Sequence, residues 1–157
     1  MGIEIERKFL VDKAKCKDSA KISSEIYRQG YMLTDPGKTI RIRLANNKGF
    51  ITIKGISIKA SRPEFEYEIP SKDAAELLNN FCTSQITKIR HKVYHGGKLW
   101  EVDEFLGDNE GLIIAEIELS NEEEQFNPPE WLAQEVTSET KYYNSNLSLF
   151  PYKKWHQ

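Results

Sequence analysis

The sequence contains little cysteine and no excess of charge of either sign. Only two cysteines, Cys16 and Cys82, occur among the 157 residues, which is too few for a disulfide framework and does not match the spacing of a zinc site. Lys and Arg number 22 against 24 for Asp and Glu, which gives a formal net charge of −2. Proteins that bind nucleic acid or anionic membranes through their overall charge are normally basic. The composition therefore argues against a general nucleic-acid binder and against a polybasic membrane anchor.

Long apolar segments are also missing. No apolar run approaches the roughly 20 residues that a membrane-spanning helix requires. The first residues, Met1–Val11, are charged from Glu4 onward and alternate in polarity, unlike a secretory signal. No low-complexity linker divides the chain. We therefore expect a single domain over residues 1–157, located in the cytoplasm and without a membrane partner.

Alternation between apolar and charged residues dominates the sequence, as is typical of β-strands with one apolar face. In one such segment, Ile40 and Ile42 fall on one face and Arg41 and Arg43 fall on the other. The pattern recurs about eight times along the chain and is weakest in residues 26–33. The predicted strands are Ile3–Phe9, Ile26–Leu33, Thr39–Leu44, Phe50–Lys54, Glu64–Ile69, Thr87–Val93, Leu99–Phe105 and Leu112–Leu119.

Helices are predicted in four places between or after these strands. They are Asp12–Ile22, a helix capped by Ser71, a short helix opened by Asn127 and Pro128 that includes Leu132, and Ser138–Leu147. In the helix capped by Ser71, the side expected to be buried consists of Ala74, Leu77, Leu78 and Phe81. Hairpin turns are expected at Asp35–Gly37, Asn46–Gly49 and His95–Gly97.

The pattern repeats at an offset of 60 residues. Charged residues coincide at this offset in the pairs Glu4/Glu64, Glu6/Glu66, Arg28/Lys88, Arg41/Glu101 and Arg43/Asp103. Each half of the chain then contains a strand, a helix and three more strands, which indicates two copies of a β-α-β-β-β unit. An eight-stranded antiparallel sheet can close and so remove its exposed edges. The expected fold class is therefore α+β: a closed eight-stranded antiparallel β-barrel, or tunnel, with peripheral helices.

The charged faces of the strands can point either to water or to the barrel interior. A single strand with one charged face most simply turns that face to water, but like charges two positions apart repel each other, and here several strands carry them. In a closed barrel whose apolar faces pack outward, the charged faces line the interior instead. The interior cations would be Lys8, Arg41, Arg43, Lys54, Arg62, Lys88, Arg90 and Lys92, and the carboxylates Glu4, Glu6, Glu64, Glu66, Glu68, Glu101, Asp103, Glu116 and Glu118. Glu68 and Lys92 fit equally well in solvent beyond the tunnel mouth.

The charges of such an interior indicate the class of ligand that it binds. Burying many charges is costly unless they pair, stay hydrated or bind something. Arg and Lys side chains suit phosphate oxygens, whereas clustered carboxylates suit a hard divalent cation such as Mg²⁺ or Mn²⁺. A metal-bound polyphosphate supplies partners for both sets, so the pattern predicts a site for such a complex.

Glu4, Glu6 and Lys8 form an E-x-E-x-K signature near the start of the chain. With this signature the sequence resembles the CYTH superfamily of triphosphate tunnel metalloenzymes, and most of all its short bacterial inorganic tripolyphosphatases. The resemblance extends over nearly the whole chain and also rests on Arg41, Arg43, Lys54, Arg62-x-Glu64-x-Glu66, Lys88-x-Arg90, Glu101-x-Asp103 and Glu116-x-Glu118. It implies an eight-stranded antiparallel tunnel in which a triphosphate is the substrate.

We therefore predict a divalent-metal-dependent phosphoanhydride hydrolase with inorganic tripolyphosphate as the first candidate substrate. The substrate-binding residues would be Arg41, Arg43, Lys54, Arg62, Lys88 and Arg90. One Mg²⁺ or Mn²⁺ would be held by Glu4, Glu6 and Glu118 with Glu116 and Asp103 nearby, and a second by Glu64 and Glu66. Lys8 and Glu6 are the predicted catalytic residues, and Lys8 would orient the attacking water or stabilise the phosphoryl oxygens.

Other activities stay open at the level of the sequence. A class IV-type adenylate cyclase, or a nucleoside or thiamine triphosphatase, would use the same residues, and a non-catalytic polyphosphate- or nucleotide-binding module would bind without turnover. No motif indicates a purine pocket, and no nucleic-acid partner is expected. Tyr142 and Tyr143 are assigned to helix packing rather than to closing a tunnel end. The sequence does not predict an oligomeric state.

Overall fold

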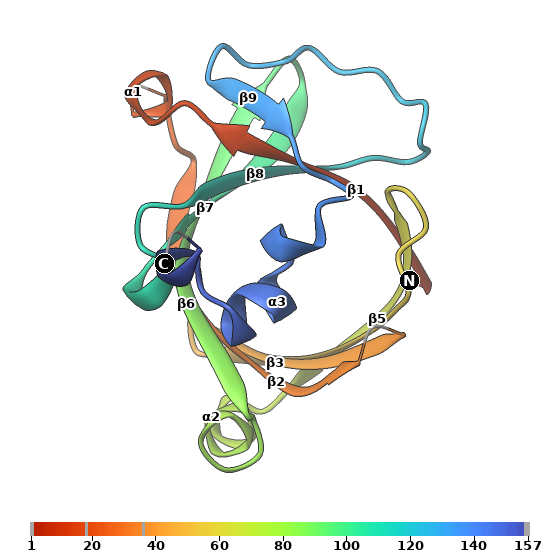
Figure 1. Cartoon of the computed structure of the whole chain (residues 1–157), viewed down its shortest axis with the longest axis vertical. Coiled ribbons are helices and arrows are strands. Elements are labelled where there is room, and N and C mark those ends of the chain that lie inside the picture. The colour runs from red at the N-terminus through yellow and green to blue at the C-terminus, as the bar shows by residue number, and fades with distance from the viewer. Residues whose placement is uncertain (1, 18, 36, 156–157) are drawn as a thin grey trace.

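The computed structural model describes residues 2–17, 19–35 and 37–155, which form a structure built largely of antiparallel strands (Figure 1). The strands are β1 (Gly2–Val11), β2 (Ser23–Asp35), β3 (Lys38–Ala45), β4 (Lys48–Gly55), β5 (Ser61–Ile69), β6 (Ser84–His95), β7 (Lys98–Phe105), β8 (Ile113–Glu118) and β9 (Leu132–Glu135). The helices are α1 (Lys13–Cys16), α2 (Ser71–Asn80) and α3 (Asn144–Leu149), with 3₁₀ turns η1 (Gly107–Asn109), η2 (Thr140–Tyr142) and η3 (Tyr152–Lys154). None of the helices in these ranges has the length and apolar character needed to cross a membrane.

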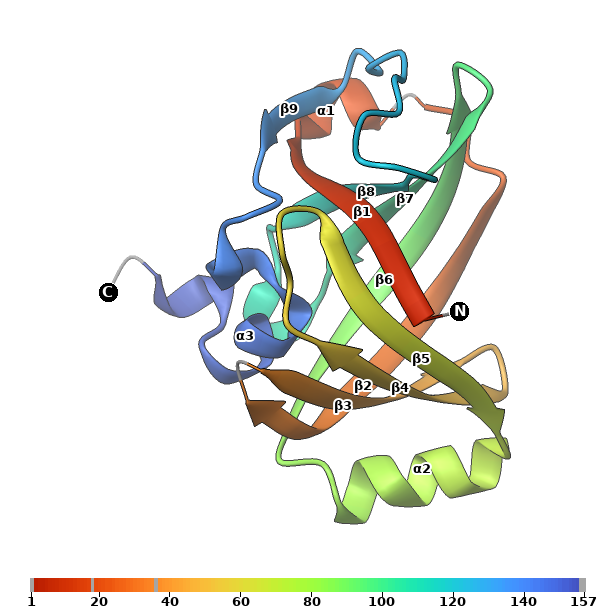
Figure 2. The same ribbon diagram turned by 90° about the vertical axis from the view of Figure 1, so that its right-hand side faces the viewer.

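Eight of the strands close into a barrel. Their hydrogen-bonded order is β5-β4-β3-β2-β6-β7-β8-β1, and β1 pairs with β5 to complete the ring. Every pairing is antiparallel. β9 pairs with β1 and lies beside the ring (Figures 1 and 2). The predicted closed eight-stranded antiparallel barrel is confirmed.

The order of elements confirms the internal duplication. The first copy is β1-α1-β2-β3-β4 and the second is β5-α2-β6-β7-β8. β3 begins at Lys38 and its counterpart β7 begins at Lys98, which is the expected offset (98 − 38 = 60). The chain therefore builds one barrel from two similar halves.

Two of the apolar clusters of the core lie outside the barrel wall. On β3, Ile42 is fully buried beneath Ala74 and Leu78 of α2. On the far side of the barrel, the ring of Trp100 on β7 lies edge to face against Phe9, 5.9 Å away, and Trp131, 5.7 Å away. Since successive strand residues point to opposite faces, outward apolar packing turns the charged residues into the barrel.

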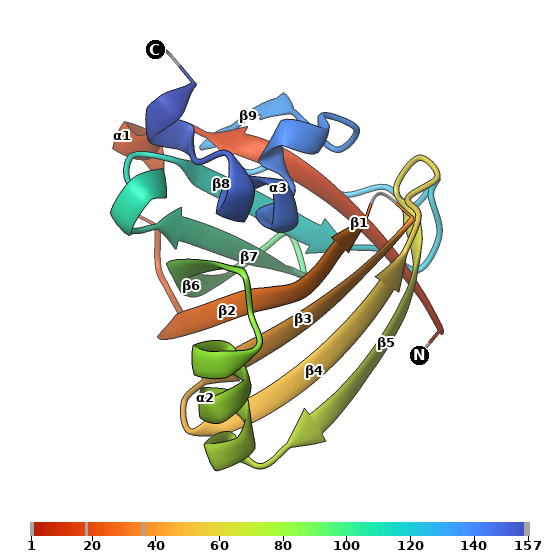
Figure 3. The same cartoon turned by 60° about the horizontal axis from the view of Figure 1, so that its bottom comes forward.

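α1 and α2 lie on the outside of the barrel, but α3 lies across one of its ends (Figures 1 and 3). Leu147 of α3 is fully buried and packs in a cluster with Phe105 and Ile114 at that end. The prediction that the helices are peripheral is therefore wrong for α3. The reason is that the barrel end is rimmed by apolar side chains, which α3 covers.

The first predicted helix is much shorter than expected, and the second differs from its prediction in the cap residue and in the exposure of Phe81. α1 ends at Cys16 instead of Ile22, because the Ile22 N–H donates to the Lys92 carbonyl and so joins the sheet. α2 begins at Ser71 as expected, but Pro70 is its cap residue and Ser71 makes no capping hydrogen bond. Phe81, expected to be buried, is 60% exposed just beyond the helix end.

Of the two C-terminal helices predicted from the sequence, the first does not form and the second is divided into two short pieces. Residues 127–131 are irregular and lead into β9, because the Trp131 carbonyl accepts from Asp12 N–H and the chain then pairs with β1. Within 138–147, the extended backbone of Tyr143 (φ −66°, ψ 137°) separates η2 from α3. The predicted hairpin turns at Asn46–Gly49 and His95–Gly97 are confirmed, whereas Pro36 in the third turn lies outside the described residues.

The seam between β1 and β5 is the shortest pairing in the ring. β5 pairs with β1 only from Gly2 to Ile5, and Glu6 N–H then donates to the carbonyl of Ala60, in the loop before β5. Farther along the same strand, β1 pairs with β9 instead. Two different segments therefore share this edge of β1, and the change from one to the other falls at Arg7 and Lys8.

Candidate active site

The interior of the barrel holds a polar cavity of about 220 Å³. Its lining is Glu4, Glu6, Lys8, Tyr27, Tyr31, Thr39, Arg41, Arg43, Lys54, Arg62, Glu64, Glu66, Lys88, Arg90, Glu101, Glu116, Glu118, Tyr143, Asn144 and Ser145. Fourteen of these side chains are ionisable as cations or carboxylates, seven of each sign. The cavity is therefore a balanced but densely charged site.

Thirteen of the fourteen residues predicted for the site line this cavity, and Asp103 is the exception. Asp103 is fully buried in the barrel wall, where its Oδ1 accepts from Arg90 Nε at 2.8 Å. Its Oδ2 accepts from Arg90 Nη2 at 2.9 Å and from Lys88 Nζ at 2.6 Å. With both oxygens engaged by cations, Asp103 supports substrate-binding side chains instead of facing the cavity.

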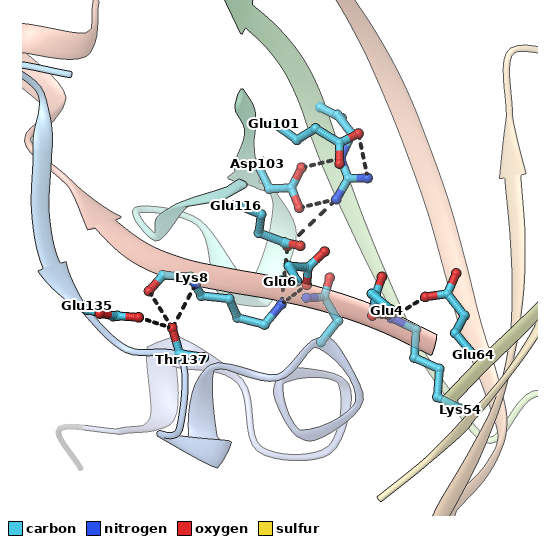
Figure 4. Close-up of polar contacts among 12 residues, drawn as sticks. Glu4, Glu6, Lys8, Lys54, Glu64, Glu101, Asp103, Glu116, Glu135 and Thr137 are labelled. Atoms are coloured by element: carbon cyan, nitrogen blue, oxygen red, sulfur yellow. Dashed lines mark hydrogen bonds and ion pairs between the residues drawn. The ribbon is translucent and has the colours of Figure 1, made fainter. Parts of the chain in front are cut away.

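Lys8 lies between two carboxylates near one side of the cavity (Figure 4). Its Nζ donates to Glu6 Oε1 at 2.9 Å and lies 3.4 Å from Glu116 Oε1. Burial opposes a charged lysine here, but Glu116 and Glu6 raise the pKa of Lys8 well above its usual value. Burial likewise works against the Glu6 carboxylate, yet the Lys8 ammonium holds the pKa of Glu6 below its usual value. At neutral pH, Lys8 and Glu6 are therefore an ion pair.

Glu116 and Glu118 of β8 behave differently from Glu6. Burial and the neighbouring Glu6 carboxylate raise the pKa of Glu116. Burial also raises the pKa of Glu118, together with the nearby charges of Glu4 and Glu6. Glu6 and Glu118 are direct register partners on β1 and β8, which explains the crowding of negative charge. Such a cluster of carboxylates favours a proton or a cation among its oxygens.

A second group of carboxylates surrounds Lys54 (Figure 4). Lys54 Nζ donates to Glu4 Oε1 at 3.0 Å and lies 3.6 Å from Glu64 Oε2. Glu64 Oε2 is buried and receives no hydrogen bond within the described part of the chain. Burial raises the pKa of Glu4, and the Glu64 carboxylate adds to the shift against the opposing Lys54 ammonium. One ammonium group therefore does not fully satisfy this pair of carboxylates.

The arginines of β3 project into the cavity from the opposite wall. Arg41 Nη2 donates to Thr52 Oγ1 at 3.0 Å and to Glu66 Oε2 at 3.2 Å. Arg43 Nε donates to the neutral Gln29 Oε1 at 3.0 Å, and its guanidinium lies 4.7 Å from the centroid of the Tyr27 ring. Burial, with the neighbouring charges of Arg41 and Arg90, lowers the pKa of Arg43 to about 10. These arginines form an anion-binding surface with little carboxylate to neutralise it.

Two further cations complete the lining. Arg62 Nε donates to the Gly55 carbonyl at 2.8 Å, and its guanidinium lies 5.7 Å from the centroid of the Tyr143 ring. Lys88 Nζ, besides its contact with Asp103, donates to Asn144 Oδ1 at 2.8 Å. Tyr143 and Asn144 lie at the start of α3, so this helix contributes to the site and also closes the barrel end.

The donor set fits a hard divalent cation. No three acidic, histidine or cysteine side chains in the described ranges converge into a ready-made metal site. The carboxyl groups instead lie in two close pairs, Glu4 with Glu64 around Lys54 and Glu6 with Glu116 around Lys8. Carboxyl groups this close share a proton or a cation. Mg²⁺ is typically bound by one or two carboxylates and completed by water and substrate phosphate oxygens, so these pairs suit a cation that arrives with a polyphosphate.

Several lining residues were not predicted as site residues. Glu101 was expected to face the interior, but no role was assigned to it. Tyr27, Tyr31 and Thr39 are uncharged, so the alternation of apolar and charged residues does not show which face of the strand they occupy. The prediction for Tyr143 is wrong: its side chain lines the cavity, together with Asn144 and Ser145, whereas Tyr142 is buried in an apolar cluster as expected. Glu68 and Lys92 are not among the lining residues.

Comparisons with known proteins agree with this geometry. The family model described as the CYTH domain matches residues 2–151. An inorganic triphosphatase of Acetivibrio thermocellus is 49% identical over 158 aligned residues, which cover 100% of both chains. An inorganic triphosphatase of Nitrosomonas europaea is 34% identical over 154 residues, which cover 93% of this chain and 97% of the relative.

The same agreement extends to three dimensions. A crystal structure of an inorganic triphosphatase superimposes with a TM-score of 0.67 at 30% identity, covering 93% of this chain and 94% of that one. The family match spans all eight barrel strands and the residues that line their cavity. The protein therefore belongs to the CYTH domain family.

Proposed function

We propose that this protein hydrolyses inorganic tripolyphosphate in the barrel cavity, with Mg²⁺ or Mn²⁺ as its cofactor. The observation that carries the proposal is a cavity lined by seven cations and seven carboxylates, which offers both an anion-binding and a cation-binding surface. Two relatives that are named inorganic triphosphatases, one of them at 49% identity over the full chain, support the same substrate class. A metal-dependent reaction is also the norm of this family.

The cations would hold the triphosphate along the cavity. Arg41 and Arg43 on β3 and Arg90 on β6 present guanidinium groups that suit the geometry of phosphate oxygens. Lys54, Arg62 and Lys88 add further positive charge along the lining. Fixing the chain and neutralising its charge is most of what phosphoryl transfer requires of a protein.

The carboxylates would hold the cofactor. Glu4, Glu6 and Glu118 are the proposed ligands of one ion, and Glu64 with Glu66 of a second, because all five face the cavity. A divalent cation supplies charge neutralisation of phosphate oxygens and makes water more acidic. Asp103 is left out of this set, because its oxygens already accept hydrogen bonds from Arg90 and Lys88.

Lys8, Glu6 and Glu116 are the proposed catalytic group. Lys8, fixed by Glu6, would stabilise the oxygens of the phosphoryl group under attack. Attack of water on a terminal phosphorus breaks the bridging P–O bond and releases pyrophosphate and orthophosphate. Glu116 is suited to take the proton of that water, since burial and the Glu6 carboxylate raise its pKa towards the range of a general base.

A product assay tests the proposal. Tripolyphosphate, ATP and thiamine triphosphate should each be incubated with the protein and Mg²⁺ or Mn²⁺, and orthophosphate, pyrophosphate and cyclic AMP measured separately. We expect orthophosphate and pyrophosphate from tripolyphosphate in a 1:1 ratio in early turnover, and their loss with EDTA. Cyclic AMP from ATP would indicate a cyclase instead, and tight binding without any product would indicate a binding module. Turnover that persists in EDTA would contradict the metal-dependent mechanism.

Paired variants connect the activity to the cavity. Glu6→Ala and Glu118→Ala should reduce turnover at least about a hundredfold, since each removes a proposed cofactor ligand. Glu68→Ala is the matched control, because Glu68 is exposed and does not line the cavity. Circular dichroism should show that all three variants fold. Wild-type rates in both cavity variants would remove the cofactor assignment.

A cytoplasmic location stays a prediction of the sequence.

A further inference from the structure

The backbone of Lys8 is held from outside the barrel by the chain that follows β9. Lys8 N–H donates to Thr137 Oγ1 at 3.0 Å (Figure 4). The Lys8 carbonyl accepts from Val136 N–H at 2.8 Å. One of these bonds is a backbone hydrogen bond just beyond the end of β9, and the other uses a side-chain hydroxyl as acceptor. Thr137 therefore contacts the one residue of the lining that lies between Glu6 and Glu116.

Thr137 is itself fixed by an ion pair on the outer surface. Its hydroxyl donates to Glu135 Oε2 at 2.6 Å. The Arg7 guanidinium donates two hydrogen bonds to the same carboxylate, from Nε to Oε2 at 2.8 Å and from Nη2 to Oε1 at 2.6 Å. The Arg7 guanidinium also lies 5.4 Å from the ring centroid of Phe9 and 5.0 Å from that of Phe126. Arg7, Glu135 and Thr137 form a hydrogen-bonded unit, named here the Arg7 clamp.

The clamp occupies the weakest point of the barrel wall. β5 stops pairing with β1 at Ile5, and the Ala60 carbonyl accepts from Glu6 N–H. The next N–H on this edge is that of Lys8, which donates to the Thr137 hydroxyl. A small side cavity of about 30 Å³ lies at this place and includes Glu6, Lys8, Ala60 and Thr137 in its lining. Without a contact here, the Lys8 backbone would border water-sized space on its β5 side.

We propose that Thr137, held by Arg7 and Glu135, is a positioning residue that fixes the Lys8 ammonium for phosphoryl transfer. The inference rests on the proposed catalytic role of Lys8. Lys8 Nζ lies 2.9 Å from Glu6 and 3.4 Å from Glu116 and is only 14% exposed, so small shifts of its backbone change both contacts. Thr137 is not among the residues that line the main cavity, and its hydrogen bonds connect it to the site through the backbone of Lys8.

A merely structural role would have different consequences. The Val136–Lys8 backbone hydrogen bond and the β1–β9 pairing do not involve the Thr137 hydroxyl. Removing only that hydroxyl therefore leaves the strand pairing in place and deprives the Lys8 N–H of its acceptor. A positioning role then predicts a loss of kcat with binding preserved, because substrate affinity depends mainly on the other cations.

The experiment uses Thr137→Val, Thr137→Ser and, as matched control, Ser138→Ala, which removes an exposed neighbouring hydroxyl. Thr137→Val should lower kcat for tripolyphosphate about tenfold with KM within about twofold, which is the order expected for one displaced catalytic contact. Thr137→Ser, which keeps the hydroxyl, should retain kcat within about threefold of the wild type, and Ser138→Ala should match it. Glu135→Gln, which keeps an acceptor for Thr137 but weakens the Arg7 fork, should fall between these values.

A second readout does not depend on activity. The ¹⁵N–¹H signal of the Lys8 ammonium reports how firmly this group is held, through the exchange rate of its hydrogens with water. We expect exchange several-fold faster in Thr137→Val than in wild type, and no change in Thr137→Ser or Ser138→Ala. If wild-type protein released no phosphate from tripolyphosphate, the proposed function would fail while this signal still decided whether Thr137 positions Lys8.

The outcomes that overturn the inference are specific. Unchanged kcat and unchanged ammonium exchange in Thr137→Val would show that the hydroxyl does not position Lys8. Equal damage in Thr137→Val and Thr137→Ser would indicate packing of the threonine methyl group rather than its hydroxyl. If Thr137→Val did not fold, Glu135→Gln would decide in its place, and wild-type values in that variant would contradict the role of the Arg7 clamp.

Discussion

Two pairs of cations face the same cavity but have different partners. Lys88 and Arg90 on β6 are bound to Asp103 on β7, Lys88 at 2.6 Å and Arg90 through both of its arms at 2.8 and 2.9 Å. Arg90 also reaches Glu101 at 3.2 Å. The β6 pair is thus neutralised by the barrel wall itself before any ligand binds.

Arg41 and Arg43 on β3 have much less negative charge near them. Arg41 pairs only with Glu66 at 3.2 Å among the described residues, and its Nε is buried without an acceptor. Arg43 forms no ion pair in those residues and donates to the neutral Gln29. The duplication explains the contrast, since the positions 60 residues after these arginines carry Glu101 and Asp103. We infer that the β3 pair is kept for an external anion, whereas the β6 pair also holds the wall together.

The largest expected effect comes from removing the carboxylate that neutralises Lys88 and Arg90 on β6. Asp103→Asn leaves Lys88 and Arg90 buried without their carboxylate, and loss of one partner of a buried ion pair costs about 3–5 kcal/mol. We expect the free energy of unfolding, measured with urea, to fall by about that amount. Glu104→Gln on the outward face of the same strand is the control and should cost less than about 1 kcal/mol. Wild-type stability of Asp103→Asn would show that the wall does not depend on this carboxylate.

The next effect tests the β3 side. Arg43→Gln removes a guanidinium that repels Arg41 and Arg90 and forms no ion pair in the described structure. We expect stability within about 1 kcal/mol of wild type but a KM for tripolyphosphate raised about ten- to a hundredfold, since a hydrogen bond to a charged group contributes about 1.5–3 kcal/mol. Arg28→Gln, whose side chain binds Gln85 and Asn79 away from the cavity, should leave KM unchanged. A large loss of stability with normal KM would reverse the comparison.

A third prediction extends the comparison to the carboxylates. The pKa values of Glu4, Glu116 and Glu118 are raised by burial first and by neighbouring charge second. A carboxyl group with a higher pKa when folded stabilises the fold fully below its unfolded pKa, near 4.5, and this contribution is lost as the pH rises through the folded value. The pKa of Asp103 is far below its usual range, so Asp103 contributes no change between pH 5 and pH 7.

We therefore expect the free energy of unfolding in EDTA to decrease as the pH is raised from about 5 to about 7. Added Mg²⁺ or Mn²⁺ should reduce the decrease, because a cation among these oxygens replaces the lost protons. Urea titrations at each pH measure the slope, and Glu118→Gln should make it shallower. A slope of the opposite sign would mean that the Lys8 and Lys54 ammonium groups already neutralise the carboxylates.

The sequence predicted which residues share the cavity but not how deep each one lies. Period-two alternation assigns every residue of a strand to a face, so the lining could be named strand by strand. Depth depends on the neighbouring strand: Asp103 is the direct register partner of Arg90, and the longer arginine covers the short carboxylate from the cavity side. The longer side chain of Glu101 does reach the cavity. Because this difference in depth depends on the strand register, the sequence pattern alone does not predict it.

The helices were less predictable because tertiary contacts decide them. α2 has a regular apolar side and was found, whereas α1 ends at Cys16 and the chain joins the sheet from Ile22 onward. α3 is short, and its place across the barrel end depends on Leu147 meeting the apolar rim formed by residues such as Phe105. The contacts of Tyr143 and Asn144 with the cavity follow from that position. They are distant from the other site residues in sequence and fall in no alternating pattern.

The smallest expected effect marks where the β6 surface ends. Lys92 lies two positions after Arg90 on the same face of β6, yet it is not part of the cavity lining. Lys92→Gln should therefore change KM for tripolyphosphate by less than about twofold and stability by less than about 0.5 kcal/mol. Steady-state kinetics beside Arg43→Gln measures the contrast directly. If Lys92→Gln raised KM as strongly as Arg43→Gln, the anion would extend along β6 beyond the cavity. The contrast between a β3 pair kept for the anion and a β6 pair that also holds the wall together would then not hold.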